Sequence, residues 1–205
     1  MKTKLKKLVL FLLITLPLLS LAQEEEEEEE IQTLFANKPL KISGFGGPVV
    51  NVTSMNNDFA LVHGFSGAAL FNQKFYAGFY VRQLENEFSR HFITGNSYDF
   101  YFNHRGLLLG YIFMPKSVLH FNIGLQAGKG ELEYEDPVLY NWYYDDFVLI
   151  LQPSIEAEIN LAKFMRVGVG VNFRFLNDVN DIPGYNNSDF SDIGGQISLK
   201  FGWFK

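Results

Sequence analysis

The sequence predicts an all-β protein, an eight-stranded antiparallel up-and-down transmembrane β-barrel. Two observations carry this prediction. Apolar residues alternate with polar or small residues in one segment after another, and the connections between these segments alternate between tight turns and long polar stretches. A period of two is typical of a strand with one apolar face. Short turns at one end and longer loops at the other are typical of a barrel that crosses a membrane with strands.

Residues 1–22 predict a secretory signal peptide. Four lysines precede an apolar run from Leu8 to Leu19, and small residues follow at Ser20 and Ala22, after which we expect cleavage. The run is shorter than the roughly 20 residues that a spanning helix needs, which favours a signal over an uncleaved anchor. Residues 23–40 form an acidic lead with seven consecutive glutamates, and such a block of like charges predicts a solvated, disordered segment.

Charge and cysteine content exclude several classes of protein. Loss of the four leader lysines changes the formal net charge from -6 to -10, and the glutamate run supplies seven of these charges, so the body carries only about -3. The chain has no cysteine, so a disulfide framework is excluded. It also lacks a phosphate loop, a zinc pattern and a basic nucleic-acid surface. We therefore expect no cofactor, no metal site and no nucleic-acid partner.

Residues 41–205 predict the barrel itself. Five segments alternate clearly, at 75–81, 119–128, 151–159, 166–175 and 193–203. Three further segments, at 42–54, 59–70 and 100–113, are predicted as strands from their β-branched and aromatic content. Their pattern does not decide which side chains face out. Tight turns are expected at 71–74, 114–117 and 160–163, and long polar loops at 85–98, 129–145 and 177–189.

In the five clear strands we expect the apolar side chains to face lipid and the others to face the lumen. An eight-stranded lumen is narrow enough for side chains to fill it. Inward glycines would make room for larger inward residues, and they are expected at Gly78, Gly124, Gly128, Gly168, Gly170 and Gly202. A soluble sandwich or a lipocalin-like cup is the alternative, because alternation alone does not tell which face is wet.

The opening "SGFGGPVV", the repeated alternation and the closing "ISLKFGWFK" resemble the small bacterial outer-membrane β-barrel domains of the OmpA-transmembrane and OmpX type. The resemblance covers roughly residues 41–205. It implies a cell outer membrane location in a Gram-negative cell, contact with outer-membrane lipid and lipopolysaccharide, and assembly by the barrel-assembly machinery.

The closing strand also resembles the C-terminal signal that the barrel-assembly machinery reads. Its outward positions would be Ile197, Leu199, Phe201 and Trp203. It departs from the family pattern because Phe204 and Lys205 follow, where many members end on one aromatic residue.

Inward charges form the first candidate site. The predicted lumen charge network consists of Glu156, Glu158, Arg82, Arg166, Arg174 and Lys200. If the third short turn centres on Ala162, Glu158 lies opposite Arg166 and Glu156 lies opposite Gly168. Buried charges must be paired. The network therefore predicts a plugged lumen and a structural or surface-interaction role, with a small pore or hydrophobic-ligand conduit as the alternative.

The outer loops provide two further hypotheses. A contact patch for an extracellular ligand of unknown identity would consist of Tyr140, Trp142, Tyr143 and Tyr144. These residues also suit an interfacial girdle. An outer-leaflet lipid-modifying enzyme could use His91 or His104 with Ser89, Ser97 and Glu87. Such combinations arise often by chance in polar loops, so no residue is assigned a catalytic role. His63 and His120 are expected to be lumen or packing residues.

Overall fold

The computed structural model describes residues 39–204 except 56–57, 86–87, 92–96, 137–140 and 183–184. For residues 88–91, 97–99, 134–136 and 141–144 it describes the backbone only. The predicted signal peptide and all but the last two residues of the acidic lead lie outside the described residues. No helix in the described part is long and apolar enough to cross a membrane.

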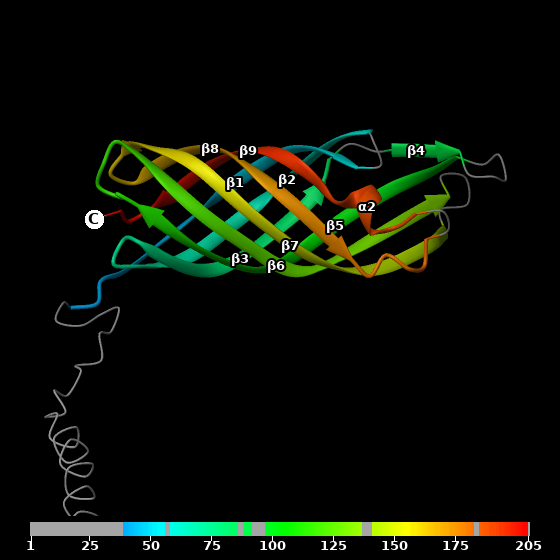
Figure 1. The fold of residues 1–205 in the computed structure, drawn as a ribbon, viewed down its shortest axis with the longest axis horizontal. Coiled ribbons are helices and arrows are strands. Elements are labelled where there is room, and N and C mark those ends of the chain that lie inside the picture. Colours follow the sequence, from blue (N-terminus) through cyan, green and yellow to red (C-terminus); the bar gives the residue numbers. More distant parts are fainter. Residues whose placement is uncertain are drawn as a thin grey trace, which may run out of the picture. The chain divides into compact units, whose positions relative to one another are not determined.

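The described strands form a single antiparallel sheet that closes on itself (Figure 1). Closure is made by β1 pairing with β9 and by β3 pairing with β5. β4 pairs with β5 beyond the point where β3 ends, so eight strands enclose the lumen. The strands are β1 (Ile42–Met55), β2 (Asp58–Phe71), β3 (Phe75–Leu84), β4 (Phe88–His91), β5 (Ser97–Phe113), β6 (Leu119–Asp136), β7 (Asn141–Ala162), β8 (Met165–Asn177) and β9 (Asp192–Gly202). The predicted fold class is confirmed.

The turn between β2 and β3 shows why the predicted tight connections are short. Asn72 and Gln73 both have positive φ, 51° and 62°, and the Lys74 amide donates to the Phe71 carbonyl at 3.0 Å. Two left-handed residues match the right-handed twist of the flanking strands. The Asn72 side chain also accepts from the backbone amide of Lys41 at 2.9 Å, which ties the start of the barrel to this turn.

Side-chain exposure confirms the facing that was predicted for the five clear strands. Along β7, Ile155 is 55% exposed, whereas Glu158, three positions on, is fully buried. The apolar face is thus the outward face, and the lipocalin-like alternative with that face inward is wrong. For the three ambiguous strands, apolar residues occupy both faces. The inward side chains include Phe45, Val49, Ala60, Val62, Leu70, Phe102, Leu108 and Ile112.

The predicted long loop 129–145 is largely strand, and the predicted loop 85–98 contains strand residues. β6 runs to Asp136 and β7 begins at Asn141, and β4 with the start of β5 lies within the predicted loop 85–98. β5, β6 and β7 continue to pair past the ends of β3 and β8 (Figure 1). The prediction failed because the alternation is reversed here: outward residues such as Glu131 and Asp145 are polar, whereas inward residues such as Leu132 are apolar. We call residues 88–91, 97–102, 131–136 and 141–147 the protruding sheet.

The predicted loop 177–189 ends in a short helix, α2 (Asn187–Phe190). Asn186 caps it, accepting from the Ser188 amide at 2.9 Å, and the Asn186 amide donates to Asp189 at 2.8 Å. These two reciprocal hydrogen bonds form a capping box. Phe190 points inward and stacks on Phe100.

We call the end of the barrel that carries the protruding sheet and α2 the outer end. An apolar cluster fills the lumen there. Phe190 joins inward residues from most of the strands, so the outer end is packed with hydrocarbon side chains. The cluster includes Met55, Ala60, Val62, Leu84, Phe100, Phe102, Leu132, Val148, Ile150, Leu176, Val179 and Ile182.

Candidate functional site

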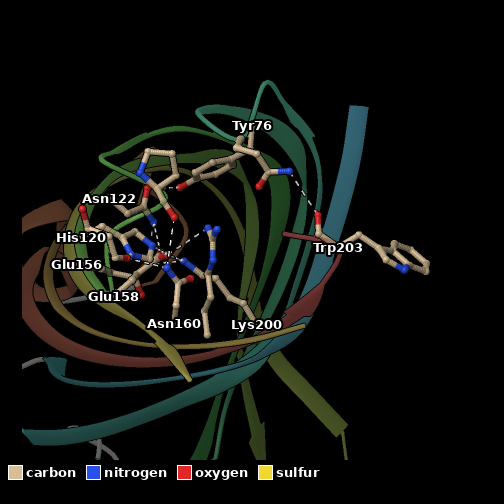
Figure 2. A network of polar contacts seen from close by, with 12 residues as sticks. Tyr76, His120, Asn122, Glu156, Glu158, Asn160, Lys200 and Trp203 are labelled. Atoms are coloured by element: carbon tan, nitrogen blue, oxygen red, sulfur yellow. Dashed lines mark hydrogen bonds and ion pairs between the residues drawn. The ribbon is translucent and has the colours of Figure 1, made fainter. Parts of the chain in front are cut away.

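A buried ion-pair cluster lies in the half of the lumen nearer the short turns. Lys200 on β9 donates through Nζ to Glu156 Oε2 at 2.7 Å and also to Glu158 Oε1 on β7 (Figure 2). All three side chains are buried. One ammonium therefore bridges two carboxylates that lie two residues apart on one strand.

Polar side chains from β3 and β6 complete the cluster. Asn122 donates to both carboxylates, to Glu156 Oε2 and Glu158 Oε1 at 2.9 Å each. Its own oxygen accepts from the Tyr76 hydroxyl at 3.0 Å. His120 Nε2 lies 3.1 Å from Glu158 Oε2. The expectation that His120 is a lumen residue is correct. Asn122 and Tyr76 were not predicted as members, although both lie at the inward parity of strands whose facing was predicted.

Arg166 belongs to the cluster, but the predicted register is wrong by two residues. Arg166 lies opposite Asn160, and Glu158 lies opposite Gly168. The pairing shifts between Asn160 and Ala162, where a bulge adds one residue to β7. The sequence pattern gives no sign of a bulge, because one extra residue next to a turn leaves the alternation on either side intact.

The Arg166 guanidinium makes two contacts. It lies 3.9 Å from Glu158 Oε2 and stacks over the Phe204 ring at 3.8 Å. Phe204 is the residue in which the chain departs from the family pattern, and here it covers an inward cation. Lys200 and Arg166 thus supply two cations for the two carboxylates.

Arg82 and Arg174 lie apart from this cluster. Arg82 donates to the carbonyls of Phe65 and Val81 and to Ser66 Oγ, each at 2.8 Å. Arg174 donates to the carbonyls of Phe190 and Ser54, at 2.9 and 3.0 Å. Backbone oxygens and the Ser66 hydroxyl therefore accept the hydrogen bonds of these two guanidinium groups. The predicted six-residue set separates into one cluster of four and two single arginines.

Three of the predicted glycines make room for the cluster. A Cβ at Gly124 would lie 3.0 Å from the Tyr76 hydroxyl, and Cβ atoms at Gly168 and Gly170 would crowd the Glu156 side chain. Gly110, which was not predicted, lies even closer beneath the Tyr76 ring. At Gly78, Gly128 and Gly202 the space is occupied mainly by the neighbouring strand, so those glycines permit close strand approach instead.

The cluster is suited to hold strands together and is not suited to catalysis. Its carboxylates are buried, so a substrate cannot reach them, and the apolar cluster closes the lumen on the outer side. Among the described residues there is no group of three or more His, Cys, Asp or Glu side chains that could hold a metal ion.

The structure corrects two histidine assignments. His104, expected near a loop, is buried in the lumen, where its ring stacks on Phe102 and Nδ1 lies 3.4 Å from the Tyr80 hydroxyl. His63, expected inside, faces outward and lies 2.9 Å from Glu85. The β2 pattern concealed this because its inward residues are apolar or small.

The other loop candidates fall partly outside the described residues. This applies to Tyr140 and Glu87, and to the side chains of Ser89, His91 and Ser97. The backbone of Trp142, Tyr143 and Tyr144 belongs to β7 and not to a loop, while their side chains are not described. The contact patch and the loop triad therefore stay predictions.

The cluster and the closed sheet define a small β-barrel with a packed interior. No family model and no curated protein sequence matches the chain. Its fold is similar to that of Neisserial surface protein A, with a TM-score of 0.59 and 9% identity over 80% of this chain and 99% of that chain.

A second similar structure is Ail, the attachment invasion locus protein of Yersinia pestis, in complex with the heparin analogue sucrose octasulfate. The TM-score is 0.51, with 12% identity over 78% of this chain and 96% of that one. At such identities the likeness shows the fold alone. The fold is that of the small outer-membrane barrels that the sequence resembles.

Proposed function

We propose that the chain is an integral outer-membrane barrel protein with a structural and surface-interaction role, exported by a signal peptide over residues 1–22. One observation carries the membrane location. Large apolar side chains on the outward face are strongly exposed, as at Phe79 (70%), Val169 (58%) and Ile197 (59%). A soluble protein rarely exposes so extensive an apolar surface, whereas lipid requires one.

The buried cluster serves the structural part of this role. It joins β6, β7, β8 and β9 from inside through contacts to Glu156 and Glu158. A small pore is less well supported, because the lumen beyond the cluster is packed with apolar side chains over its outer end. The charged residues therefore act as a plug.

The protruding sheet is the surface that suits a partner. Its outward parity carries Glu131 and Glu133 on β6 and Asp145 on β7, with Glu133 directly opposite Asp145. This negative face favours a cationic partner, such as a basic peptide segment. Ail was crystallised with a sulfated, hence anionic, ligand. The opposite sign of charge here argues against a ligand of that kind on this face.

Lipid, lipopolysaccharide and the barrel-assembly machinery are the other partners that we propose. Ile197, Leu199 and Phe201 lie on the outward face of β9, and Trp203 follows it with 74% of its surface exposed. The Trp203 indole points away from the lumen in Figure 2. All four side chains are therefore available to an assembly factor before lipid covers them.

Expression in a Gram-negative host tests the membrane location. The protein should co-sediment with outer membranes and shift on denaturing gels only after heating, as closed barrels do. A protein that stays in the soluble fraction without a heat-dependent shift would contradict the proposal.

The absence of cysteine allows a test of orientation with single reporters. In intact cells a membrane-impermeant maleimide should label an Asp145→Cys variant, at the protruding sheet. It should not label Lys116→Cys, in the tight turn between β5 and β6. Labelling of Lys116→Cys alone would mean that the barrel is inserted the other way.

A further inference from the structure

A groove of about 640 Å³ crosses the outward face of the barrel over β2, β3, β5, β6 and β7. We call it the wall groove. Phe65, Val81 and Phe147 give it an apolar part, and Arg105 and Lys129 stand among its polar residues. No motif in the sequence indicates it, because it arises only when β5 pairs with β6.

Arg105 and Lys129 lie directly opposite each other in the β5–β6 ladder. Both side chains are exposed. Neither makes a hydrogen bond or an ion pair with any other residue that the structure describes. Like charges in directly opposed positions destabilise a sheet. An anion between them would remove this repulsion, and an arginine fork is well suited to the oxygens of a phosphate.

The two cations lie where the outward surface changes character. On the side of the short turns the next outward residues are Leu107 on β5 and Ala127 on β6. On the other side they are Asn103 and Glu131, which face each other one step further out. The cations therefore mark the outer edge of the apolar surface. In a bilayer this is the level of the headgroups, directly outside the hydrocarbon.

The other charges at the wall groove favour a phosphate at this level. Glu131 lies diagonally from Arg105 on the outer side and repels an anion there, which restricts it to the apolar side. His63 Nδ1, on the β2 side of the groove, lies 2.9 Å from Glu85 Oε2. Arg82 also lines the groove, and its guanidinium donates to Phe65, Val81 and Ser66. The anion is thus held between two cations, with Phe65, Val81 and Phe147 nearby for acyl chains.

We propose that the wall groove binds the phosphate of an outer-leaflet lipid headgroup through Arg105 and Lys129. This inference rests on the proposed membrane location. The commitment to a lipid, and not to free phosphate, follows from the apolar part of the groove and from its place at the edge of the apolar surface.

The test measures lipid binding to the purified full-length mature barrel in detergent by native mass spectrometry. The probes are bis-phosphorylated lipid A and the same lipid A with both phosphates removed. The test variant is R105Q/K129Q. The control is K74Q/K116Q, which removes two exposed cations from the tight turns and changes the net charge equally. The single variant K129Q should give an intermediate loss.

The wild type and the control should bind the phosphorylated lipid A about tenfold or more tightly than the dephosphorylated form. The dephosphorylated form lacks the phosphate to which Arg105 and Lys129 would make two charge-assisted contacts. R105Q/K129Q should bind both forms alike. Retention of the wild-type preference by R105Q/K129Q, or an equal loss in the control, would overturn the inference. So would complete competition by millimolar inorganic phosphate, which would mark a free-phosphate site.

The heat-dependent gel shift separates this inference from the proposed function. A wild type that shows the shift but does not distinguish the two lipids contradicts only the lipid site. A wild type that neither enters the membrane nor shifts contradicts the membrane location as well. A variant that lacks the shift is replaced by the single substitution K129Q, in which the arginine is kept.

Discussion

Replacing Lys200 by methionine should destabilise the barrel by about 3–5 kcal/mol, the usual cost of leaving a buried charge without its partner. Lys200 Nζ lies 2.7 Å from Glu156 Oε2 and also contacts Glu158. At an effective dielectric constant of about 20, each such contact represents a gross attraction of about 6 kcal/mol. Desolvation of the ammonium offsets several kcal/mol of this sum, which leaves a net loss in the stated range.

A second substitution tests whether charge is the cause. In K200M/E158Q the remaining charges are Glu156 and Arg166, so the cluster regains balance. We expect the double variant to be at least about 1 kcal/mol more stable than the sum of the two single effects, which is the range of coupling seen between contacting residues. Lys163→Met is the matched control, because Lys163 is exposed in the turn between β7 and β8. It should change stability by less than about 0.5 kcal/mol.

The assay is reversible urea unfolding in detergent micelles, followed by far-ultraviolet circular dichroism and by the fraction of heat-shifted protein on gels. A loss of less than about 1 kcal/mol in Lys200→Met would refute the reasoning, since that is the range of exposed ion pairs. Additive effects in the double variant would refute it equally, because they would mean that size and packing, and not charge, decide the loss.

Three further predictions concern the wall and the acidic lead. Gly110→Ala should lower the free energy of unfolding in urea by about 1–3 kcal/mol, because its Cβ would lie 2.2 Å from the Tyr76 ring. Gly195→Ala is the control and should be neutral, because a Cβ there would have nothing within 4 Å. Ile123→Arg, in the middle of the outward apolar residues of β6, should lower the free energy of unfolding in a bilayer by about 2–4 kcal/mol. Val118→Arg, in the turn, should lower it by only about 0–1 kcal/mol. Equal losses in the two variants would contradict the lipid-facing wall. Shortening the run Glu24–Glu30 should leave the heat-shifted fraction unchanged, and failed insertion would contradict its assignment as a solvated lead.

The sequence predicted the fold well because a barrel in lipid imposes alternation on every crossing strand. Residues 119–128 of β6, 151–159 of β7 and 166–175 of β8 show this, since their polar and glycine residues face a narrow lumen. The facing of β1, β2 and β5 was left open. In β1 and β2 apolar residues such as Val49 and Val62 occupy the lumen as well, so both faces have the same character.

The candidate site was predicted in part. Residues of inward parity were identified correctly, but their pairing depends on a bulge near Ala162 that leaves no periodic signal. Arg82 and Arg174 were grouped with the cluster because a sequence gives the facing of a residue and not its height in the barrel. That Arg105 lies opposite Lys129 follows only from the register between β5 and β6. The predicted limits of these two strands did not define that register.

The buried cluster is also nearly self-contained along the chain. His120 and Asn122, Glu156 and Glu158, Arg166 and Lys200 come from β6, β7, β8 and β9, which are consecutive along the chain. These C-terminal strands therefore carry their own counter-charges, and the ion pairs need no charged residue from β1 to β5. Tyr76 of β3 reaches the cluster through Asn122, across Gly110 of β5 and Gly124 of β6. Its hydroxyl thus joins a strand of the N-terminal half of the chain to the C-terminal cluster from within the lumen.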